Sequence, residues 1–481
     1  MVRTYNPVKL VILVVGLALA RAGLVERTRV TRIVDLAWPR IVTGVARMSK
    51  SAVDIAMVGI AVGPAAIAGI GFASPYWGFT FTVGGGVATG TIALVSQRFG
   101  AEAFDELGQA IRSSVLLVVI VAGAVAAAMW AMPTALISLL TDDPRSIELG
   151  AAYLRTISVG VPFAALNLIG SRILIGADDS WTPMVLRGTG AVANVVLNAV
   201  LIFGLGMGVV GAALGTVLSN VVIVVLFAIG LLGYRLPVVG HLPVTVSPTG
   251  PYVHLPTIRD LVRISTPAIG RRGIWTVARF PMLAFVALFG QQVVAAYVIS
   301  RRIWGLMNTP GWGFGLATSS LVGQSLGEGD ESLAEEYGHE IAAIAVLTYV
   351  VTASIVFVFA EPIVELFVDG PAGETVSIAV GLVYAASIAV IARAVGGTYA
   401  GALDATGDTR WPFYSRALGM FGLAIPLTYL GATTPLGLWG LYLSYFGQSL
   451  APAVVNYYRF RTGKWKAISR RYRPDSATPT D

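Results

Sequence analysis

The sequence predicts an all-α integral membrane protein of about twelve transmembrane helices, folded as two pseudo-symmetric six-helix bundles. Hydrophobic residues make up 56% of the 481 residues and charged residues only 12%, and the mean hydropathy is +0.76. A soluble domain carries about 25% charged residues, so this composition belongs to a membrane protein. Apolar segments of membrane-spanning length recur along nearly the whole chain. The second half also repeats motifs of the first, which predicts two related bundles.

The internal repeat has an offset of 227 to 229 residues. The segment 94–100 returns as 321–327 with its Leu, Val, Gln and Gly in register, Pro39 returns as Pro267, and Asp179 returns as Asp408. Repeats of this parallel kind are related by an axis along the membrane normal and place a binding site near the bilayer midplane.

A hydrocarbon core of about 30 Å takes about 20 helical residues to cross, and this length sets the expected spans. In the first half they cover residues 35–61, 66–97, 106–132, 148–174, 182–204 and 210–233. In the second half they cover residues 262–289, 293–324, 334–360, 376–401, 412–431 and 436–458.

The expected domains follow these spans. An N-terminal extension (1–32) precedes the N-terminal bundle (33–234), a linker (235–260), the C-terminal bundle (261–460) and a basic, largely disordered cytoplasmic tail (461–481). The linker contains five prolines, which are incompatible with a continuous helix. The apolar run at residues 8–20 is expected as an extra helix or an interfacial anchor, and a cleaved signal peptide is the alternative.

The net charge of +7 follows membrane topology rather than a nucleic-acid-binding surface, so we expect no nucleic-acid partner. Basic residues gather at the end of the chain and in alternate loops, whereas the other loops are nearly free of them. This asymmetry places both termini in the cytoplasm of a multi-pass protein in the cell (plasma) membrane, in contact with its lipids. With no cysteine, disulfides and thiolate metal sites are excluded.

Several motifs in order resemble the multidrug and toxic compound extrusion (MATE) family of antiporters, in its prokaryotic and archaeal type. The motifs are Pro39 with Val53-Asp54-Ile55-Ala56-Met57-Val58-Gly59, Leu94-Val95-Ser96-Gln97, Gly176-Ala177-Asp178-Asp179 with Pro183, Leu197-Asn198-Ala199-Val200, Gly211-Ala212-Ala213-Leu214-Gly215-Thr216, Leu321-Val322-Gly323-Gln324, Ala405-Thr406-Gly407-Asp408 and Gly463-Lys464-Trp465. The resemblance implies two six-helix bundles around a cavity that opens alternately to either side. It also implies export of organic compounds in exchange for H⁺ or Na⁺.

Asp54 lies inside the first expected span, where a carboxylate costs about 2.5 to 3.5 kcal/mol on insertion scales and needs a neutralising partner. The resemblance implies a cation site in the N-terminal bundle formed by Asp54, Asn194, Asn198 and Thr216. Family members of this type usually have a second Asp at position 198, and Asn198 cannot titrate. We therefore expect one coupling ion per cycle at most, H⁺ or Na⁺. The alternative is an ion pair with Lys50, which lies four residues before Asp54 on the same helical face.

Arginines also fall in expected spans, at Arg47, Arg271 and Arg393, while the spans 262–289, 293–324, 376–401 and 412–431 contain no acidic residue. Since an uncompensated Arg is costly in hydrocarbon, these residues predict a cavity for anionic or zwitterionic organic substrates. The alternative is that the arginines extend to the cytoplasmic interface.

The sequence thus predicts a secondary active antiporter that exports small organic molecules, without an organic cofactor or a metal beyond Na⁺ at Asp54, and acting as a monomer. A lipid-linked oligosaccharide flippase is the alternative among transporters. An intramembrane enzyme is the alternative of another class, and it is disfavoured because no H-E-x-x-H motif or Cys nucleophile is present.

Overall fold

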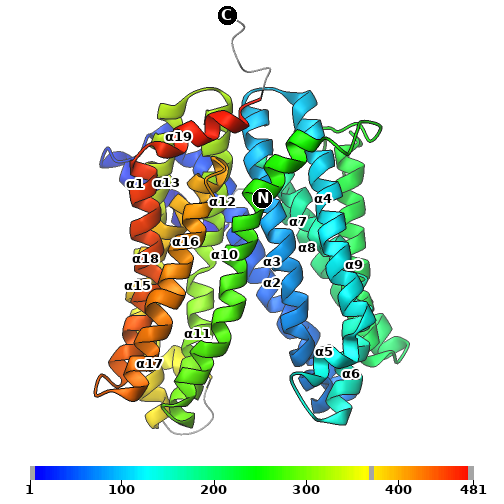
Figure 1. The fold of residues 1–481 in the computed structure, drawn as a ribbon, viewed down its shortest axis with the longest axis vertical. Coiled ribbons are helices and arrows are strands. Elements are labelled where there is room, and N and C mark those ends of the chain that lie inside the picture. The colour runs from blue at the N-terminus through cyan, green and yellow to red at the C-terminus, as the bar shows by residue number, and fades with distance from the viewer. Residues whose placement is uncertain (1–5, 368–372, 475–481) are drawn as a thin grey trace, which may run out of the picture. The chain divides into compact units, whose positions relative to one another are not determined.

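The computed structural model describes residues 6–367 and 373–474, and within them the chain is helical, with no strand. Figure 1 shows the helices. The first repeat contains α2 (Arg27–Val62), α3 (Pro64–Gly100), α4 (Phe104–Ala131), α5 (Pro133–Ser138), α6 (Pro144–Ser158), α7 (Val161–Gly176), α8 (Trp181–Asn198), the π-helix η1 (Ala199–Gly204) and α9 (Gly208–Leu231).

The second repeat contains α10 (Leu255–Ala287), α11 (Gln291–Met307), α12 (Thr309–Gly327), α13 (Glu331–Val358), α14 (Ala360–Glu365), α15 (Glu374–Ala405), α16 (Arg410–Ala417), the π-helix η2 (Leu418–Ala424), α17 (Ile425–Thr433) and α18 (Leu438–Arg461). Every expected span coincides with one helix or with consecutive helices, which confirms the all-α, twelve-span fold class. On length and apolarity alone, six described helices qualify as spans, or seven if α6 and α7 form one.

The two repeats differ where helices break. The second helix of the first repeat, α3, is continuous through Pro75, whereas its counterpart is interrupted at Asn308 between α11 and α12. Pro310 lies in the first turn of α12, where its missing N–H costs no hydrogen bond. Conversely, α6 and α7 are bent by 49° at their junction, whereas the corresponding α15 is one helix of 32 residues.

The chain packs as two compact units. Unit 1 contains Met1–Ile41 and Gly270–Asp481, and unit 2 contains Val42–Ile269. The boundaries fall inside α2 and α10, at positions that correspond under the repeat. The first part of α2 therefore packs with the second repeat, and the first part of α10 packs with the first repeat.

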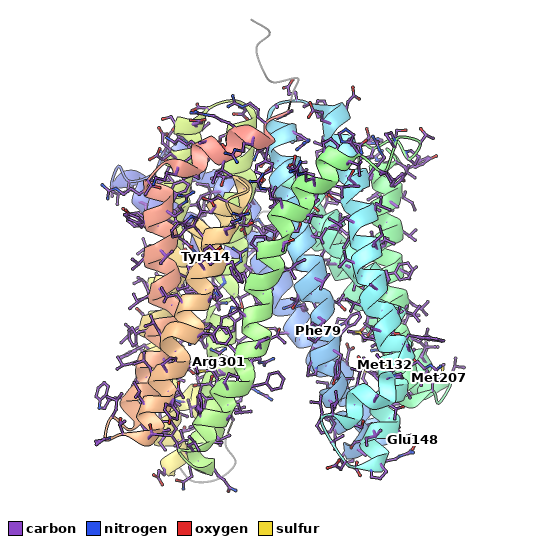
Figure 2. The ribbon with its side chains drawn as sticks, in the orientation of Figure 1. Phe79, Met132, Glu148, Met207, Arg301 and Tyr414 are labelled. Atoms are coloured by element: carbon purple, nitrogen blue, oxygen red, sulfur yellow. The ribbon has the colours of Figure 1, made fainter. Side chains whose placement is uncertain are left out.

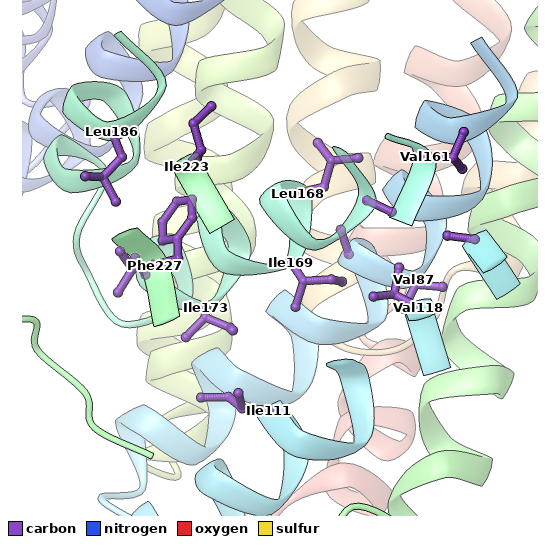
Figure 3. Close-up of a cluster of buried hydrophobic side chains, with 14 of the residues drawn as sticks. Val87, Ile111, Val118, Val161, Leu168, Ile169, Ile173, Leu186, Ile223 and Phe227 are labelled. Carbon is purple, nitrogen blue, oxygen red and sulfur yellow. The ribbon is translucent and has the colours of Figure 1, made fainter. Parts of the chain in front are cut away.

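In unit 2, the hydrophobic core joins α3, α4, α6, α7 and α9 (Figure 3). Ile169 and Ile173 of α7 lie among Val87, Val118 and Phe227 in this cluster. The ring of Phe227 packs directly on Gly170, where a Cβ atom would lie 2.7 Å from a ring carbon. A side chain at Gly170 would therefore separate α7 from α9.

In unit 1, α15 packs against α18, α12, α13 and α11 (Figure 1). The contact between α12 and α15 is very close, because a Cβ atom at Gly401 would lie 2.2 Å from the carbonyl oxygen of Gly315. Small residues allow this approach of two backbones, as is common between membrane helices.

At the N-terminal end of unit 1, α1 (Pro7–Arg21) is held by an ion pair of 2.7 Å between Lys9 and Asp35 and packs on α13. Its 15 residues are fewer than the roughly 20 that a span requires.

The described part of the tail is helical up to Tyr472. It forms α19 (Lys464–Ser469) and a 3₁₀ turn, η3 (Arg470–Tyr472). The buried ring of Trp465 stacks on Phe460 at 4.9 Å, and Lys466 and Arg470 form ion pairs with acids on α13. The composition of the tail alone did not indicate the ring stacking or these ion pairs. Residues 475–481 of the expected disordered tail lie outside the described residues.

Candidate functional site

Asp54 lies on α2 within unit 2, and its two carboxylate oxygens have different partners. Lys50 Nζ lies 2.7 Å from Oδ2, one helical turn earlier, and the Asn198 amide Nδ2 donates to Oδ1 at 2.9 Å. The side chains of Lys50 and Asp54 are each 22% exposed, so the ion pair is neither fully solvated nor sealed in the core. A pair of this accessibility can open at a lower cost than a fully buried one.

Two asparagines on α8 connect Asp54 to α9. Asn194 and Asn198 are fully buried and share one face of the helix, since they are four residues apart. The Asn198 amide lies 3.4 Å from Asn194 Oδ1, and the Asn194 amide donates to the Thr216 hydroxyl at 3.3 Å. The structure thus brings Lys50, Asp54, Asn194, Asn198 and Thr216 together, and we call these five residues the Asp54 cluster.

The end of α8 is unusual at this point. The π-helix η1 begins at Ala199, immediately after Asn198, and π-helical turns occur often at functional sites. Gly215 of α9 packs against the same amide, because a Cβ atom there would lie 2.0 Å from Asn198 Oδ1. The absence of a side chain at Gly215 is therefore a requirement for the position of Asn198.

The Asn198 amide has a definite orientation relative to Asp54. Its NH₂ group faces the carboxylate, and its buried Oδ1 has no hydrogen-bond partner within the described residues. The Asp54 carboxylate thus contacts the Lys50 ammonium and one amide donor. A metal cation would need oxygen ligands, so the amide would have to turn and Lys50 Nζ would have to leave Oδ2.

The polar network continues beyond the residues expected from the sequence. Asn220 donates to the Thr216 carbonyl at 2.9 Å, the Asn167 amide reaches Asn220 at 3.3 Å, and Arg187 Nε donates to Asn167 Oδ1 at 3.1 Å. Tyr153 of α6 lies within electrostatic range of Asp54. Each of these residues is a polar side chain in an expected span, which the sequence does show. Other polar residues share this property, so the sequence did not single these out.

The three arginines expected at a substrate cavity lie in different surroundings. Arg47, in unit 2, lies over the ring of Phe81 at 5.5 Å. Arg271 and Arg393 are both in unit 1, where Arg271 forms an ion pair of 2.6 Å with Asp404 and Arg393 Nε donates to Asn308 Oδ1 at 2.5 Å.

The partner of Arg271 corrects an expectation. The sequence predicted no acid within the spans that carry Arg271 and Arg393, and the expected span 376–401 ended before Asp404. In the structure α15 continues to Ala405, and Asp404 lies in its last turn with a 10% exposed side chain.

No group of three or more His, Asp or Glu side chains that could hold a metal ion occurs among the described residues. A cation at the Asp54 cluster would accordingly be bound by one carboxylate together with amide and hydroxyl oxygens.

Comparison with known proteins identifies the family. The MatE family model matches residues 39–200 and 267–430, one match in each repeat and together more than half of the chain. The chain belongs to the MatE family. Its members are transporters and not enzymes, and this member is a multi-pass plasma-membrane protein.

Individual relatives agree over most of the chain. The multidrug resistance protein PmpM of Pseudomonas aeruginosa is 27% identical over 449 residues, which cover 89% of this chain and 91% of that protein. Among solved structures, a MATE transporter in a bent conformation has a TM-score of 0.84 at 20% identity and covers 99% of this chain and 100% of its own. A MOP-superfamily transporter from Pyrococcus furiosus, described as having a binding pocket of reversed polarity, has a TM-score of 0.82 at 21% identity, with 91% and 96% covered. These structural similarities support the fold.

Proposed function

We propose that this protein is a secondary active antiporter that exports small organic molecules in exchange for one H⁺ or Na⁺ per cycle. The observation that carries the proposal is the ion pair of Asp54 with Lys50 beside the buried amide of Asn198. An intramembrane carboxylate is costly, and here it has a partner that competes with an incoming cation. Asp54 is the single carboxylate of the cluster, so one monovalent cation neutralises it.

The coupling step follows from this competition. A proton or Na⁺ on Asp54 removes the attraction that holds Lys50, and the release of the pair changes the contacts of α2. A ligand shifts a conformational equilibrium only when it binds two states with different affinity. In this proposal the two states differ in whether Lys50 or the cation neutralises Asp54.

Of the two ions, the geometry favours H⁺. A proton needs only a carboxylate oxygen, whereas Na⁺ also needs the Asn198 amide to turn its oxygen inward. Na⁺ remains the alternative because Asn194, Asn198 and Thr216 all carry oxygen atoms.

We further propose that both termini lie in the cytoplasm and that the protein acts as a monomer among membrane lipids. PmpM of Pseudomonas aeruginosa is named a multidrug resistance protein, which supports organic molecules as cargo. Arg393, which contacts the neutral side chain of Asn308, supports an anionic or zwitterionic cargo, and we propose it together with the Asp404-paired Arg271 for the substrate site. Arg47 of unit 2 is proposed for the same role.

The test is efflux from proteoliposomes under separately imposed proton and sodium gradients, with the zwitterion norfloxacin and the cation ethidium as probes. We expect one of the two gradients to drive efflux, and the variant Asp54→Asn to lose this stimulation. Asp142→Asn, at an exposed acid of the same unit, is the matched control and should retain it. Gradient-driven efflux that is unchanged in Asp54→Asn would refute the proposal.

A further inference from the structure

Three arginines of unit 1 surround two tryptophans. The guanidinium carbons of Arg301, Arg393 and Arg416 lie 5.1, 5.4 and 5.3 Å from the ring centroid of Trp275. Arg301 and Arg393 also lie 4.6 and 5.3 Å from the centroid of Trp304. We call these five residues the arginine–tryptophan cluster. They come from α10, α11, α15 and α16, and Figure 2 labels Arg301.

The cluster concentrates positive charge. Each of the three guanidinium carbons lies within 5.4 Å of the ring centroid of Trp275, so no two of these carbons can be farther apart than twice 5.4 Å. Arg271 is also within electrostatic range of Arg393 and Arg416, and its charge is balanced by Asp404. Within the described residues, the cluster arginines donate hydrogen bonds to neutral side chains, Arg393 to Asn308 and Arg301 to Gln448.

Arg416 is the decisive member. Its side chain is only 9% exposed, and its Nε and Nη1 atoms have no hydrogen-bond partner within the described residues. The indole N–H of the buried Trp304 is also without one. A buried guanidinium with unused donors is costly, and the contact with an indole face offsets only part of this cost.

The three unsatisfied groups share one chemical preference. All are N–H donors; two belong to Arg416 and the third, on Trp304, adjoins Arg301 and Arg393, so the complementary group is an oxoanion. Arginine is well suited to carboxylate, phosphate and sulfonate groups because its donors lie in a fixed plane. Trp275 packs against Trp304 at 5.5 Å and is only partly buried, so some of its surface beside these donors is open to an aromatic ring.

We propose that the arginine–tryptophan cluster is a binding site for a small aromatic anion, with its oxoanion group on Arg416 and its ring against Trp275. Arg301 and Arg393 supply the neutralising charge from neighbouring helices. That the bound anion is exported cargo rests on the proposed antiport function, whereas the binding itself does not.

The experiment is calorimetric titration of the full-length protein in detergent with p-toluenesulfonate, which keeps its negative charge at any working pH. Tolyltrimethylammonium, of similar shape and opposite charge, is the matched cation. We expect saturable binding of the sulfonate, weaker by at least tenfold in Arg416→Gln and only partly restored in Arg416→Lys. Arg302→Gln, at the exposed arginine adjacent to Arg301, should bind as the unmodified protein does.

Arg301→Gln provides a second variant at a half-buried position, and it should also weaken binding if Arg416→Gln does not fold. Size-exclusion chromatography checks that each variant is monodisperse. Equal affinity in Arg416→Gln and Arg302→Gln would overturn the proposal, as would equal binding of the cation.

A parallel titration with phosphatidylglycerol in mixed micelles tests a lipid phosphate as the source of the anion. Arg416-dependent binding of the lipid without binding of the sulfonate would also overturn it.

This titration uses no ion gradient. Loss of coupling at Asp54 would therefore leave its result unchanged, and absence of sulfonate binding would leave gradient-driven efflux of norfloxacin intact.

Discussion

Lys50 Nζ lies 2.7 Å from Asp54 Oδ2 on the same face of α2, so that a lysine holds the carboxylate proposed to carry the coupling ion. In the proposed exchange the lysine and an incoming cation compete for Asp54, and this competition would set the apparent affinity for the ion. Opening of the pair is the event on which the proposed exchange depends.

Removal of the competing charge should strengthen ion binding. In Lys50→Met we expect the ion concentration for half-maximal efflux to fall about fivefold, since a partly buried ion pair contributes on the order of 1 kcal/mol and 1.4 kcal/mol corresponds to a factor of ten. The measurement is initial efflux rate against ion concentration in proteoliposomes. Lys50→Arg keeps the charge and is the control; equal half-saturation in Lys50→Met and the unmodified protein would contradict the competition.

A second carboxylate at position 198 should raise the ion stoichiometry. Asn198→Asp would place two acids within hydrogen-bonding distance, and such a pair cannot remain doubly ionised without taking up a cation. We expect the number of coupling ions exchanged per cargo molecule, measured from simultaneous ion and cargo fluxes, to rise from about one toward two, because the second carboxylate can be neutralised by a second cation. Asn198→Ala, which adds no titratable group, should leave it near one.

Substitution of Gly215 should reduce gradient-driven efflux more than it reduces the stability of the fold. In Gly215→Ala the new methyl group would collide with Asn198 Oδ1, and overpacking of this kind costs about 1 to 3 kcal/mol. We expect a lower Tm and a larger loss of gradient-driven efflux as Asn198 is displaced from Asp54. Gly188→Ala on α8 is the matched control, because nothing lies within 4 Å of its Cβ position. Normal coupling in Gly215→Ala would show that the position of Asn198 is unimportant.

The ion pair between Arg271 and Asp404 should stabilise unit 1 because each side chain neutralises the buried charge of the other. Asp404→Asn leaves Arg271, whose side chain is 14% exposed, without its counter-charge, and loss of one partner of a buried pair costs about 3 to 5 kcal/mol. Thermal unfolding in detergent should show a marked fall in Tm. The double variant Arg271→Gln, Asp404→Asn should recover much of it, and a double variant as unstable as the single one would argue against compensation.

Acid should weaken the start of α6. Hydrogen bonding from the Ser146 side chain and from its backbone N–H, which donates to the Asp143 carboxylate at 2.8 Å, lowers the pKa of Asp143. Stabilisation by the ionised cap is therefore complete above the ordinary Asp pKa and is lost as pH falls through the lowered value. The Tm difference between the unmodified protein and Asp143→Ala should be constant at neutral pH and shrink in acid. A difference independent of pH would exclude the charged cap.

Much of the Asp54 cluster was predictable because it depends on local spacing and on family motifs. Lys50 and Asp54 are one helical turn apart, as are Asn194 and Asn198, so each pair must share a face. The direction of the Asn198 amide and the role of Gly215 were not predictable, because they depend on how α8 packs on α9. The extent of α15 was missed because Asp404 is unfavourable in an apolar segment until Arg271 is placed beside it.

By itself the sequence determined the membrane class, the twelve helical segments, the repeat and the family. Each of these depends on residues close together in the chain or on regular spacing, and hydrophobic length is a local property. Only the tertiary structure decided that α2 and α10 each divide between the two units, that Asp404 compensates Arg271, and that Arg301, Arg393 and Arg416 converge on Trp275. These relationships join residues far apart in the chain, and the packing of helices, which no local pattern encodes, determines which of them meet.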